Sequence, residues 1–382
     1  MTSGTLLIVS HVTHYQYGGT LYAYGPYARE IDIWADLFEE VRIAAPLRSE
    51  RPPADALAFT RANIRVASQP ETGGETVGAK LRQLALLPFL TWSLARELRS
   101  ADVVHVRCPG NLGLLGVCLA PLFARYRIAK YAGQWTDYPG EAWTVRLQRA
   151  ILRSRWWRAP VTVYGQWPGQ PSHVVPFFTS IMTEAQMEQA RGCAAQKGLV
   201  GAPRILYVGR LSFDKRVDVV LRALYQLRRQ GVEAQFTIVG DGPARADLEL
   251  LVDRLALADR VCFAGAVSFD RVLEHYRQAD FLTLVSSSEG WPKAIAEAMA
   301  FGLVCVGSDR GAVPWLLGEE RGLTVPVDDA DALAAALLGV IRDPALYVRL
   351  SRNSAQWAQQ FTLEGLREAL RRLMRQSWQL EI

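Results

Sequence analysis

The segment SSSEGWPKAIAEAMAFG, residues 286–302, decides the fold of the second half of this chain. It follows the apolar run FLTLV and precedes a second apolar run, LVCVG, so it predicts a strand, a loop, a helix and another strand. Pro292 suits the first helical turn and Gly302 supplies a stop. The segment therefore places Glu289 in the loop and Glu297 on the helix.

The same alternation of short apolar strands with helical stretches runs along the whole chain, which is typical of βαβ units and parallel sheets. In the first half the predicted strands cover residues 6–10, 41–44, 63–66, 102–106, 128–131, 161–164 and 173–175. In the second half they cover residues 204–208, 235–239, 260–263, 281–285, 303–306 and 323–325. We expect an α/β protein with two Rossmann-like parallel-sheet domains, because single domains usually contain about 100–200 residues.

The domain boundaries follow from composition. We predict an N-terminal domain over residues 1–191, a Gly- and Ala-rich linker over 192–203 and a C-terminal domain over 204–355. Residues 356–382 should end in a helix that crosses back to the N-terminal domain. The apolar residues of that helix recur at helical spacing: Leu366, Leu370 and Leu373.

Composition and charge restrict the classes of protein. The five cysteines are scattered without a C-x-x-C pair, so neither a disulfide framework nor a zinc site is indicated. The apolar run at residues 6–9 is too short for a signal peptide or a membrane span, and a cytoplasmic protein is expected. Residues 1–178 carry 19 Lys and Arg against 13 Asp and Glu. This excess indicates either an anionic partner or a solvated basic surface.

A second polar cluster, LYVGRLSFDKRVD at residues 206–218, puts Arg210 and Lys215 in the loop that leaves a predicted strand. Ligands of parallel sheets bind beyond the carboxyl ends of the strands, and helix N-termini favour phosphate. The guanidinium fork of Arg and the mobile charge of Lys suit a diphosphate. Gly240-Asp241-Gly242 lacks the third glycine of a dinucleotide loop and predicts a turn.

Three motifs in this order carry a resemblance to a known family. Gly209 to Lys215 has the form G-R-L…K, Glu289 and Glu297 have E-x7-E spacing, and Gly311 to Pro314 reads GAVP. The chain resembles the retaining glycosyltransferases of GT-B fold in glycosyltransferase family four, "glycosyl transferases group 1". The resemblance is strong over residues 204–326 and loose in the first half.

The resemblance implies two domains that face a central cleft, an N-terminal domain on the acceptor side and a C-terminal domain that binds the nucleotide sugar. The donor substrate implied is a UDP-sugar, with a GDP-sugar as the alternative, and no cofactor is implied. It implies catalytic roles for Arg210 and Lys215 at the diphosphate and for Glu289 at the sugar, while Glu297 bonds the ribose. The donor-contacting residues implied are Gly18, Gly19, Gly209, Arg210, Lys215, Ala266, Val267, Glu289, Gly290, Trp291, Pro292, Lys293 and Glu297. Ala266 and Val267 would lie near the base.

The acceptor side departs from the family pattern. Gln134, followed by Trp135, stands where relatives often have a histidine that contacts the donor sugar. Arg107 stands where many relatives have a second histidine, which suits an anionic acceptor. His105 lies in an apolar strand and is equally typical of a core residue.

The chemistry implied by the family is transfer with retention of anomeric configuration, in which the leaving phosphate oxygen helps to deprotonate the acceptor hydroxyl. No Asp-x-Asp motif follows a predicted strand. Side-chain cations and helix amides are therefore expected to stabilise the departing diphosphate without a divalent metal ion. The product would belong to a polysaccharide, a glycolipid or another glycoconjugate.

The stretch WTVRLQRAILRSRWWRAP, residues 143–160, leaves two interpretations open. Basic helices with aromatic residues settle on anionic membranes, which predicts a peripheral membrane protein on the inner face. The same pattern fits a helix whose apolar face, with Trp143 and Leu147, packs on the N-terminal sheet.

Three other classes of protein are alternatives to this interpretation. A catalytically silent glycosyltransferase-like subunit would not need Arg210, Lys215 and both glutamates together. A GT-B-type sugar-nucleotide epimerase remains an alternative that needs acid and base residues in the cleft. Nucleic-acid binding is not indicated, because the net charge is only +5 and the basic aromatic stretch is short.

Overall fold

A computed structural model describes residues 2–53, 55–74, 76–138, 140–179 and 182–379. The chain forms two compact units, the first made of residues 1–178 with 365–382 and the second of residues 179–364. Residues 192–203, expected as a linker, include the end of one helix of the second unit and the chain that leads to its first strand. The predicted boundaries and domain roles stay predictions.

The first unit is built on a parallel sheet of order β11-β10-β9-β8-β1-β4-β7. Its strands are β1 (Thr2–Val9), β4 (Phe38–Ala45), β7 (Ile64–Ser68), β8 (Val103–Cys108), β9 (Tyr126–Tyr131), β10 (Val161–Tyr164) and β11 (Val174–Phe177). Each strand predicted in the first half overlaps one of these. The order reverses between β1 and β8, which makes this pair the topological switch point of the sheet.

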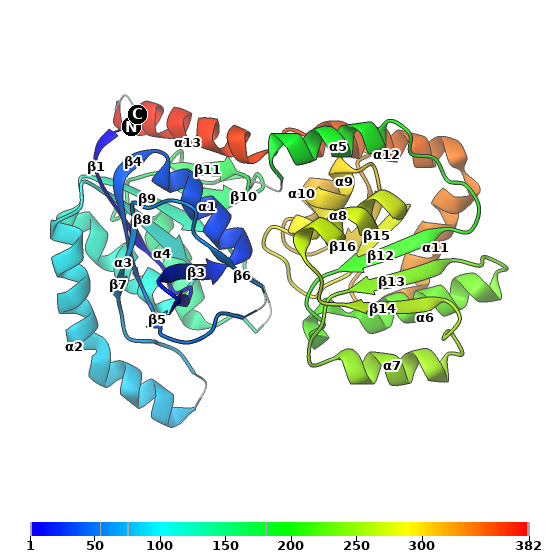
Figure 1. The fold of residues 1–382 in the computed structure, drawn as a ribbon, viewed down its shortest axis with the longest axis horizontal. Helices are drawn as coiled ribbons and strands as arrows, with labels where there is room; N and C mark the ends of the chain where they lie inside the picture. Colours follow the sequence, from blue (N-terminus) through cyan, green and yellow to red (C-terminus); the bar gives the residue numbers. More distant parts are fainter. Residues whose placement is uncertain (1, 54, 75, 139, 180–181, 380–382) are drawn as a thin grey trace. The chain divides into compact units, whose positions relative to one another are not determined.

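Helices cover both faces of this sheet (Figure 1). Leu7 and Val9 of β1 point into an apolar cluster with α2 (Val77–Arg99), α3 (Asn111–Phe123) and α4 (Trp143–Arg153). On the other face, Trp34 of α1 (Gly25–Ala35) stacks on His105 of β8. The helix α13 (Leu363–Trp378) joins this unit from residue 365 onward, where Arg367 pairs with Asp36. Alternate strand residues thus serve two separate helix layers.

A small second sheet, absent from the sequence prediction, combines two strands that lie between β1 and α1 in the chain with two that follow β4. Its order is β5-β2-β3-β6, with β2 (His14–Tyr17), β3 (Thr20–Tyr24), β5 (Leu47–Arg48) and β6 (Ala56–Ala58). β2 and β3 form an antiparallel hairpin. Its strands have only two to five residues, so the apolar periodicity that identifies longer strands is too short to recognise here.

The second unit has a parallel sheet of order β14-β13-β12-β15-β16-β17. The strands are β12 (Arg204–Val208), β13 (Gln235–Val239), β14 (Val261–Gly265), β15 (Phe281–Leu284), β16 (Val304–Ser308) and β17 (Leu323–Val325). They agree with the six predicted strands. The helices are α5 (Glu184–Ala194), α6 (Val217–Arg229), α7 (Arg245–Arg254), α8 (Phe269–Gln278), α9 (Lys293–Ala300), α10 (Val313–Leu317), α11 (Ala330–Arg342) and α12 (Pro344–Ala358).

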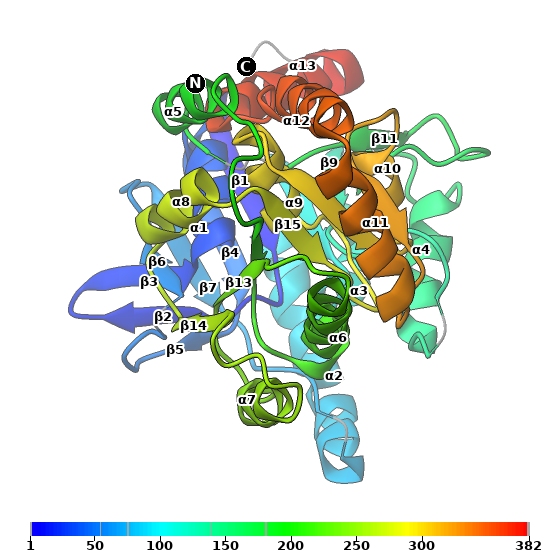
Figure 2. The ribbon, with the colours of Figure 1, turned by 90° about the vertical axis from the view of Figure 1, so that its right-hand side faces the viewer.

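These helices also lie on both faces of their sheet. Figure 2 shows α6 and α11 on one face and α8 and α12 on the other. α6 contacts α7 and α11, and α12 packs on α9. The prediction of an α/β protein with two Rossmann-like parallel-sheet units is therefore confirmed. Among the described residues, no helix combines the length and the apolar character needed to cross a membrane.

Candidate functional site

The predicted donor residues of the second unit gather at the switch point of its sheet. β12 and β15 are neighbours there, although β13 and β14 lie between them in sequence. The loop after β12 contains Arg210 and Lys215, and the loop after β15 contains Glu289. Because both strands run parallel, the two loops leave the same edge of the sheet, where ligands of this architecture bind.

Backbone contacts hold these two loops together. The amide of Ser287 donates to the carbonyl oxygen of Asp214 over 2.8 Å, and the Ser287 hydroxyl reaches the same oxygen at 3.2 Å. Gly311, at φ +57°, follows β16 and lies directly on the backbone of Glu289. A Cβ at this position would stand 1.7 Å from the Glu289 carbonyl oxygen, so only glycine permits this approach.

The two charged residues assigned to the phosphates and the sugar meet directly. Lys215 Nζ lies 2.7 Å from Glu289 Oε1, and both side chains are largely shielded, with exposed fractions of 22% and 11%. Arg210 is exposed, and its carbonyl oxygen accepts a hydrogen bond from the Tyr207 hydroxyl at 2.9 Å. Burial, followed by the charge of Glu289, raises the pKa of Tyr207, which stays a neutral donor. The loop is thus anchored, with Arg210 exposed to solvent and Lys215 held against Glu289.

Glu297 lies on α9, as predicted, and is buried. Its Oε2 accepts a hydrogen bond from the hydroxyl of Tyr276 on α8 at 2.9 Å. Burial and the Glu297 carboxylate raise the pKa of Tyr276 well above its usual value, so the phenol remains a donor. Sequence reasoning missed Tyr276, because no motif links a residue of α8 to one of α9.

The remaining donor-side predictions occupy different environments. Gly209 packs on the backbone of Gly240, Ala266 is exposed and Val267 is half-buried. Trp291 is buried and forms an aromatic cluster with Trp315, Trp357 and Phe361. Its ring therefore supports the loop, whereas Gly290, Pro292 and Lys293 precede or begin α9.

Gly18 and Gly19 lie in the first unit, whereas the other predicted donor residues lie in the second. They form the exposed turn between β2 and β3 in the first unit, at φ +58° and +79°. Two successive positive φ values are typical of the two-residue turns that connect hairpin strands. The pair thus has a structural reason for being glycine, and its contact with a donor stays a prediction.

Arg107 belongs to a buried ionic cluster that the sequence did not reveal. Its Nη1 lies 3.5 Å from Glu30 Oε2, and Lys130 Nζ lies 2.7 Å from Glu30 Oε1. Burial alone would raise the pKa of Glu30, but the two cations lower it to about 2. Two positive charges and one negative charge give this cluster a net charge of +1.

His105 packs beside this cluster. It is buried against Trp34, and burial lowers the pKa of its imidazole to about 3, so it is neutral at pH 7. Its environment is that of a core residue, which is one of the two interpretations of His105 that the sequence left open. A contact of Arg107 or His105 with an acceptor stays a prediction.

Gln134 and Trp135 follow β9. Gln134 Nε2 donates to Thr136 Oγ1 at 3.2 Å, while its Oε1 is buried and has no hydrogen-bond partner among the described residues. Trp135 is buried, and its Nε1 donates to Gln170 Oε1 at 3.0 Å. Gln134 thus has a buried oxygen without a partner among the described residues, and its contact with a donor sugar stays a prediction, whereas Trp135 is a core residue.

The basic aromatic stretch at residues 143–160 turns the opposite face inward from the one expected to pack on the sheet. Arg149 is buried with Glu141, and Trp157 is also buried. Trp143 and Leu147 are instead 71% and 39% exposed. Trp143 and Leu147 therefore do not pack inward as expected. The inner side of α4 is taken by Leu152, which belongs to the apolar cluster, and by the Arg149–Glu141 ion pair.

Among the described residues, no group of three or more His, Cys, Asp and Glu side chains could hold a metal ion. The charged groups of the second unit's site include the cations Arg210, Lys215 and Lys293 and the carboxylates of Glu289 and Glu297. This combination can bind a diphosphate through the cations and hydroxyl groups through the carboxylates.

Solved structures share this architecture. The sucrose-phosphate synthase from Thermosynechococcus elongatus superposes with a TM-score of 0.71 at 21% identity over 97% of this chain and 98% of that one. The Anabaena protein HepE in complex with UDP and glucose gives 0.70 at 16% identity over 98% of this chain and 100% of that one. The fold is therefore GT-B, the class of two Rossmann-like units found in many glycosyltransferases.

The family follows from the second half of the chain. Residues 195–357 match the family model "Glycosyl transferases group 1", so the chain carries a domain of that family, as its motifs indicated. It is 31% identical over 193 residues to alpha-D-kanosaminyltransferase of Streptomyces kanamyceticus, a match that covers 50% of each protein. It is 29% identical over 164 residues to the N-acetyl-alpha-D-glucosaminyl L-malate synthase of Bacillus anthracis, with 43% and 41% covered. The chain thus matches about half the length of these relatives.

Proposed function

We propose that the chain is a retaining glycosyltransferase that moves a sugar from a nucleoside-diphosphate donor to an acceptor hydroxyl. The observation that carries this proposal is the juxtaposition of Lys215 and Glu289 at 2.7 Å, at the switch point of a sheet in the matched family domain. The matched relatives are named alpha-D-kanosaminyltransferase, N-acetyl-alpha-D-glucosaminyl L-malate synthase, amylovoran biosynthesis glycosyltransferase and putative colanic acid biosynthesis glycosyltransferase. We therefore expect a product in polysaccharide, glycolipid or other glycoconjugate synthesis.

In the proposed reaction the bond between the anomeric carbon and the donor phosphate breaks, while the acceptor oxygen bonds the same face of that carbon. The acceptor proton passes to the leaving phosphate oxygen. Arg210 and Lys215 stabilise the charge of the departing diphosphate, and amides at the start of α9 add to this field. Glu289 orients the sugar and holds Lys215 in place through their ion pair.

The donor is proposed to be a UDP-sugar, because structural neighbours were solved with UDP and UDP-glucose. Isothermal titration of the purified chain with UDP, GDP and dTDP tests this directly. UDP should bind most tightly, and UDP-sugars should be hydrolysed slowly to UDP without acceptor. The absence of binding by all three nucleotides would contradict a donor site in the second unit.

Metal independence is part of the proposal, since side-chain cations and amides neutralise the diphosphate in this mechanism. Turnover should persist after treatment with excess EDTA. A loss of turnover that Mg²⁺ or Mn²⁺ restores would contradict the mechanism, because a divalent cation would then carry the charge assigned to Arg210 and Lys215.

We also propose that the first unit contacts an anionic membrane surface from the cytoplasmic side. Trp143 is 71% exposed and Trp156 is 47% exposed, and Arg146, Arg155 and Arg158 around them are exposed cations. Exposed aromatic and basic side chains together favour anionic interfaces. The chain should co-sediment with phosphatidylglycerol vesicles and not with phosphatidylcholine vesicles, and Trp143→Ser should weaken this binding. Equal binding to both vesicles would contradict it.

A further inference from the structure

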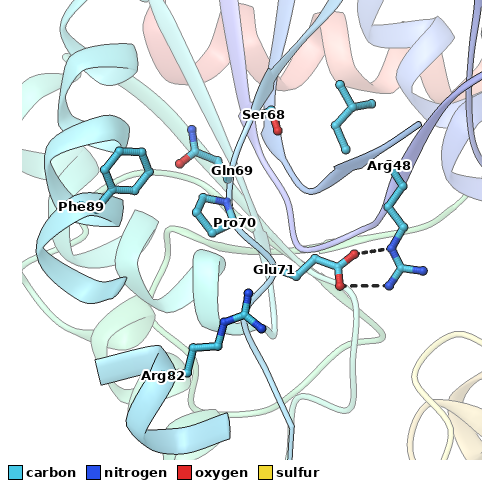
Figure 3. A pocket seen from close by; sticks show the side chains of 8 residues that line it. Arg48, Ser68, Gln69, Pro70, Glu71, Arg82 and Phe89 are labelled. Carbon is cyan, nitrogen blue, oxygen red and sulfur yellow. Dashed lines mark hydrogen bonds and ion pairs between the residues drawn. The ribbon is translucent and has the colours of Figure 1, made fainter. Parts of the chain in front are cut away.

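A pocket of about 550 Å³ opens in the first unit beyond the carboxyl end of β7 (Figure 3). Its walls come from β5, from the four residues 68–71 that end and follow β7, and from α2. The carboxyl ends of parallel strands are the usual place for ligands in such sheets. None of its residues belongs to the motifs of the donor site.

One wall presents a buried polar group that lacks a partner. Gln69 is 3% exposed, and its Nε2 donates to Ser93 Oγ at 3.0 Å, which fixes the amide. Its Oε1 is buried and accepts no hydrogen bond from any described residue. Because a buried acceptor without a hydrogen bond destabilises the protein, a ligand that donates a hydrogen bond here would remove that penalty.

The charged residues of the pocket balance one another. Arg48 forms two hydrogen bonds with the Glu71 carboxylate, at 2.5 Å and 2.9 Å, and a third with Glu50 at 3.1 Å. Arg82 of α2 approaches Glu71 from the other side, as Figure 3 shows. The pocket lining has two arginines and one glutamate, and Glu50, which lies outside the lining, neutralises Arg48 as its ion-pair partner. With Glu50 included, these charges balance, so the pocket has little attraction for a phosphate and suits a neutral ligand.

An aromatic ring completes the set. Phe89 of α2 is 51% exposed and lines the pocket next to Gln69 (Figure 3). A neutral ligand here would donate hydrogen bonds to an amide oxygen and a carboxylate and accept them from guanidinium groups. It would also cover the aromatic ring with an apolar face. A pyranose sugar meets these requirements. Pockets of about 300–1,000 Å³ hold ligands of this size.

We propose that this pocket binds a neutral saccharide unit, which makes it a subsite for the sugar part of the glycosyl acceptor. The assignment to the acceptor rests on the proposed function, whereas saccharide binding itself does not. A second pocket of about 520 Å³ shares Glu71 and Arg82 with the first. It provides room for a second sugar ring along α2.

Saturation-transfer NMR of the full chain tests the proposal with four probes: the methyl α-pyranosides of glucose, galactose, mannose and N-acetylglucosamine. At least one should receive saturation, and inorganic phosphate should not displace it. Phe89→Ala should weaken its binding by roughly tenfold, as expected when an aromatic contact is removed. Gln69→Leu should weaken it as well. The matched control is Leu84→Ala, because Leu84 is 66% exposed on the same helix and does not line the pocket.

The proposal is overturned if none of the four glycosides binds, if phosphate displaces the bound glycoside, or if Phe89→Ala binds it as well as Leu84→Ala does. Phe89 is exposed, so its replacement leaves the fold intact and the test informative even if Gln69→Leu unfolds. Titration with UDP is run on the same samples. Failure to bind UDP would contradict the donor site alone, whereas unchanged UDP binding with lost glycoside binding identifies the acceptor subsite.

Discussion

The two units are similar in architecture and differ in how they use charge at the carboxyl edge of the sheet. In the second unit, Arg210 is exposed and Lys215 is paired with a glutamate in a loop. In the first unit, Glu30 and Lys130 are almost wholly buried beside Arg107. Two parallel sheets of related topology thus carry one accessible ionic pair and one enclosed ionic cluster.

The difference teaches that charge at a strand end is not by itself a sign of a ligand site. Burying ions costs several kcal/mol per ion, and attraction between partners offsets that cost only when the set is complete. The first unit's cluster is therefore a structural element that must stay intact. The second unit's pair is partly hydrated, so a ligand can compete for Lys215 at a smaller cost.

The largest effect is expected for Glu30→Gln, which leaves Lys130 and Arg107 buried without their carboxylate. Removing one partner of a buried ion pair costs about 3–5 kcal/mol, so the free energy of unfolding should fall by that amount in urea titrations. Glu50→Gln, at an exposed ion pair with Arg48, is the control and should cost under about 1 kcal/mol. If both variants lost the same free energy of unfolding, burial would not distinguish the enclosed cluster from the exposed ion pair, and the prediction would be wrong.

Next in size are Lys215→Ala and Arg210→Ala. Each should lower turnover by about 10² to 10³, the usual loss when one group that stabilises developing charge is removed. Circular dichroism and the unfolding midpoint should not change. Arg222→Ala, which removes an exposed cation of α6, should keep wild-type turnover. If Lys215→Ala transfers sugar as fast as this control, the diphosphate assignment is wrong.

The third prediction concerns pH. The pKa of Glu30 falls from 4.5 to about 2 on folding, because attraction by Lys130 and Arg107 exceeds the effect of burial. A depressed carboxyl pKa contributes stability above pH 4.5 that is lost as the pH falls toward 2. The difference corresponds to about 3 kcal/mol. Unfolding curves between pH 5 and 2 should show this loss in the wild type and a flatter dependence in Glu30→Gln.

The smallest effect is expected for Glu297→Gln. This change keeps the shape and removes the charge, so UDP binding should weaken by roughly tenfold in calorimetric titration. Tyr276→Phe removes one partner of Glu297 but leaves its charge, and it should weaken UDP binding less. Glu289→Gln should affect transfer more than UDP binding. If Glu289→Gln weakens UDP binding more than Glu297→Gln does, the ribose and sugar roles are assigned wrongly.

How much of the site could be predicted depended on whether its members are linked through the sheet. Arg210, Lys215 and Glu289 follow strands, and the parallel-sheet rule brings the ends of neighbouring strands together. Tyr276 and Glu297 meet through the packing of α8 and α9, and Glu30 and Lys130 meet across 100 residues of chain. Such contacts depend on which helix faces pack together, and no short motif encodes that choice.

The basic aromatic stretch gives the clearest case of an expectation that packing reversed. Its helical periodicity placed Trp143 and Leu147 on one face and the arginines largely on another. The inner side of α4 instead takes Leu152 of the apolar cluster together with Arg149, for which Glu141 of the preceding loop supplies a buried partner. Periodicity identifies the faces of a helix, but the partners that the rest of the unit supplies decide which face is buried.

The sequence alone determined the α/β class, the two parallel sheets and the loop that holds Glu289, because apolar runs, Gly302 and strand-helix alternation act over a few residues. Only the tertiary structure decided which charges are enclosed and which are accessible. It also decided that Gln69 of β7's end, Arg82 and Phe89 line one pocket. The reason is physical: burial and pairing are properties of space shared by distant segments, whereas periodicity and turn chemistry are properties of neighbours along the chain.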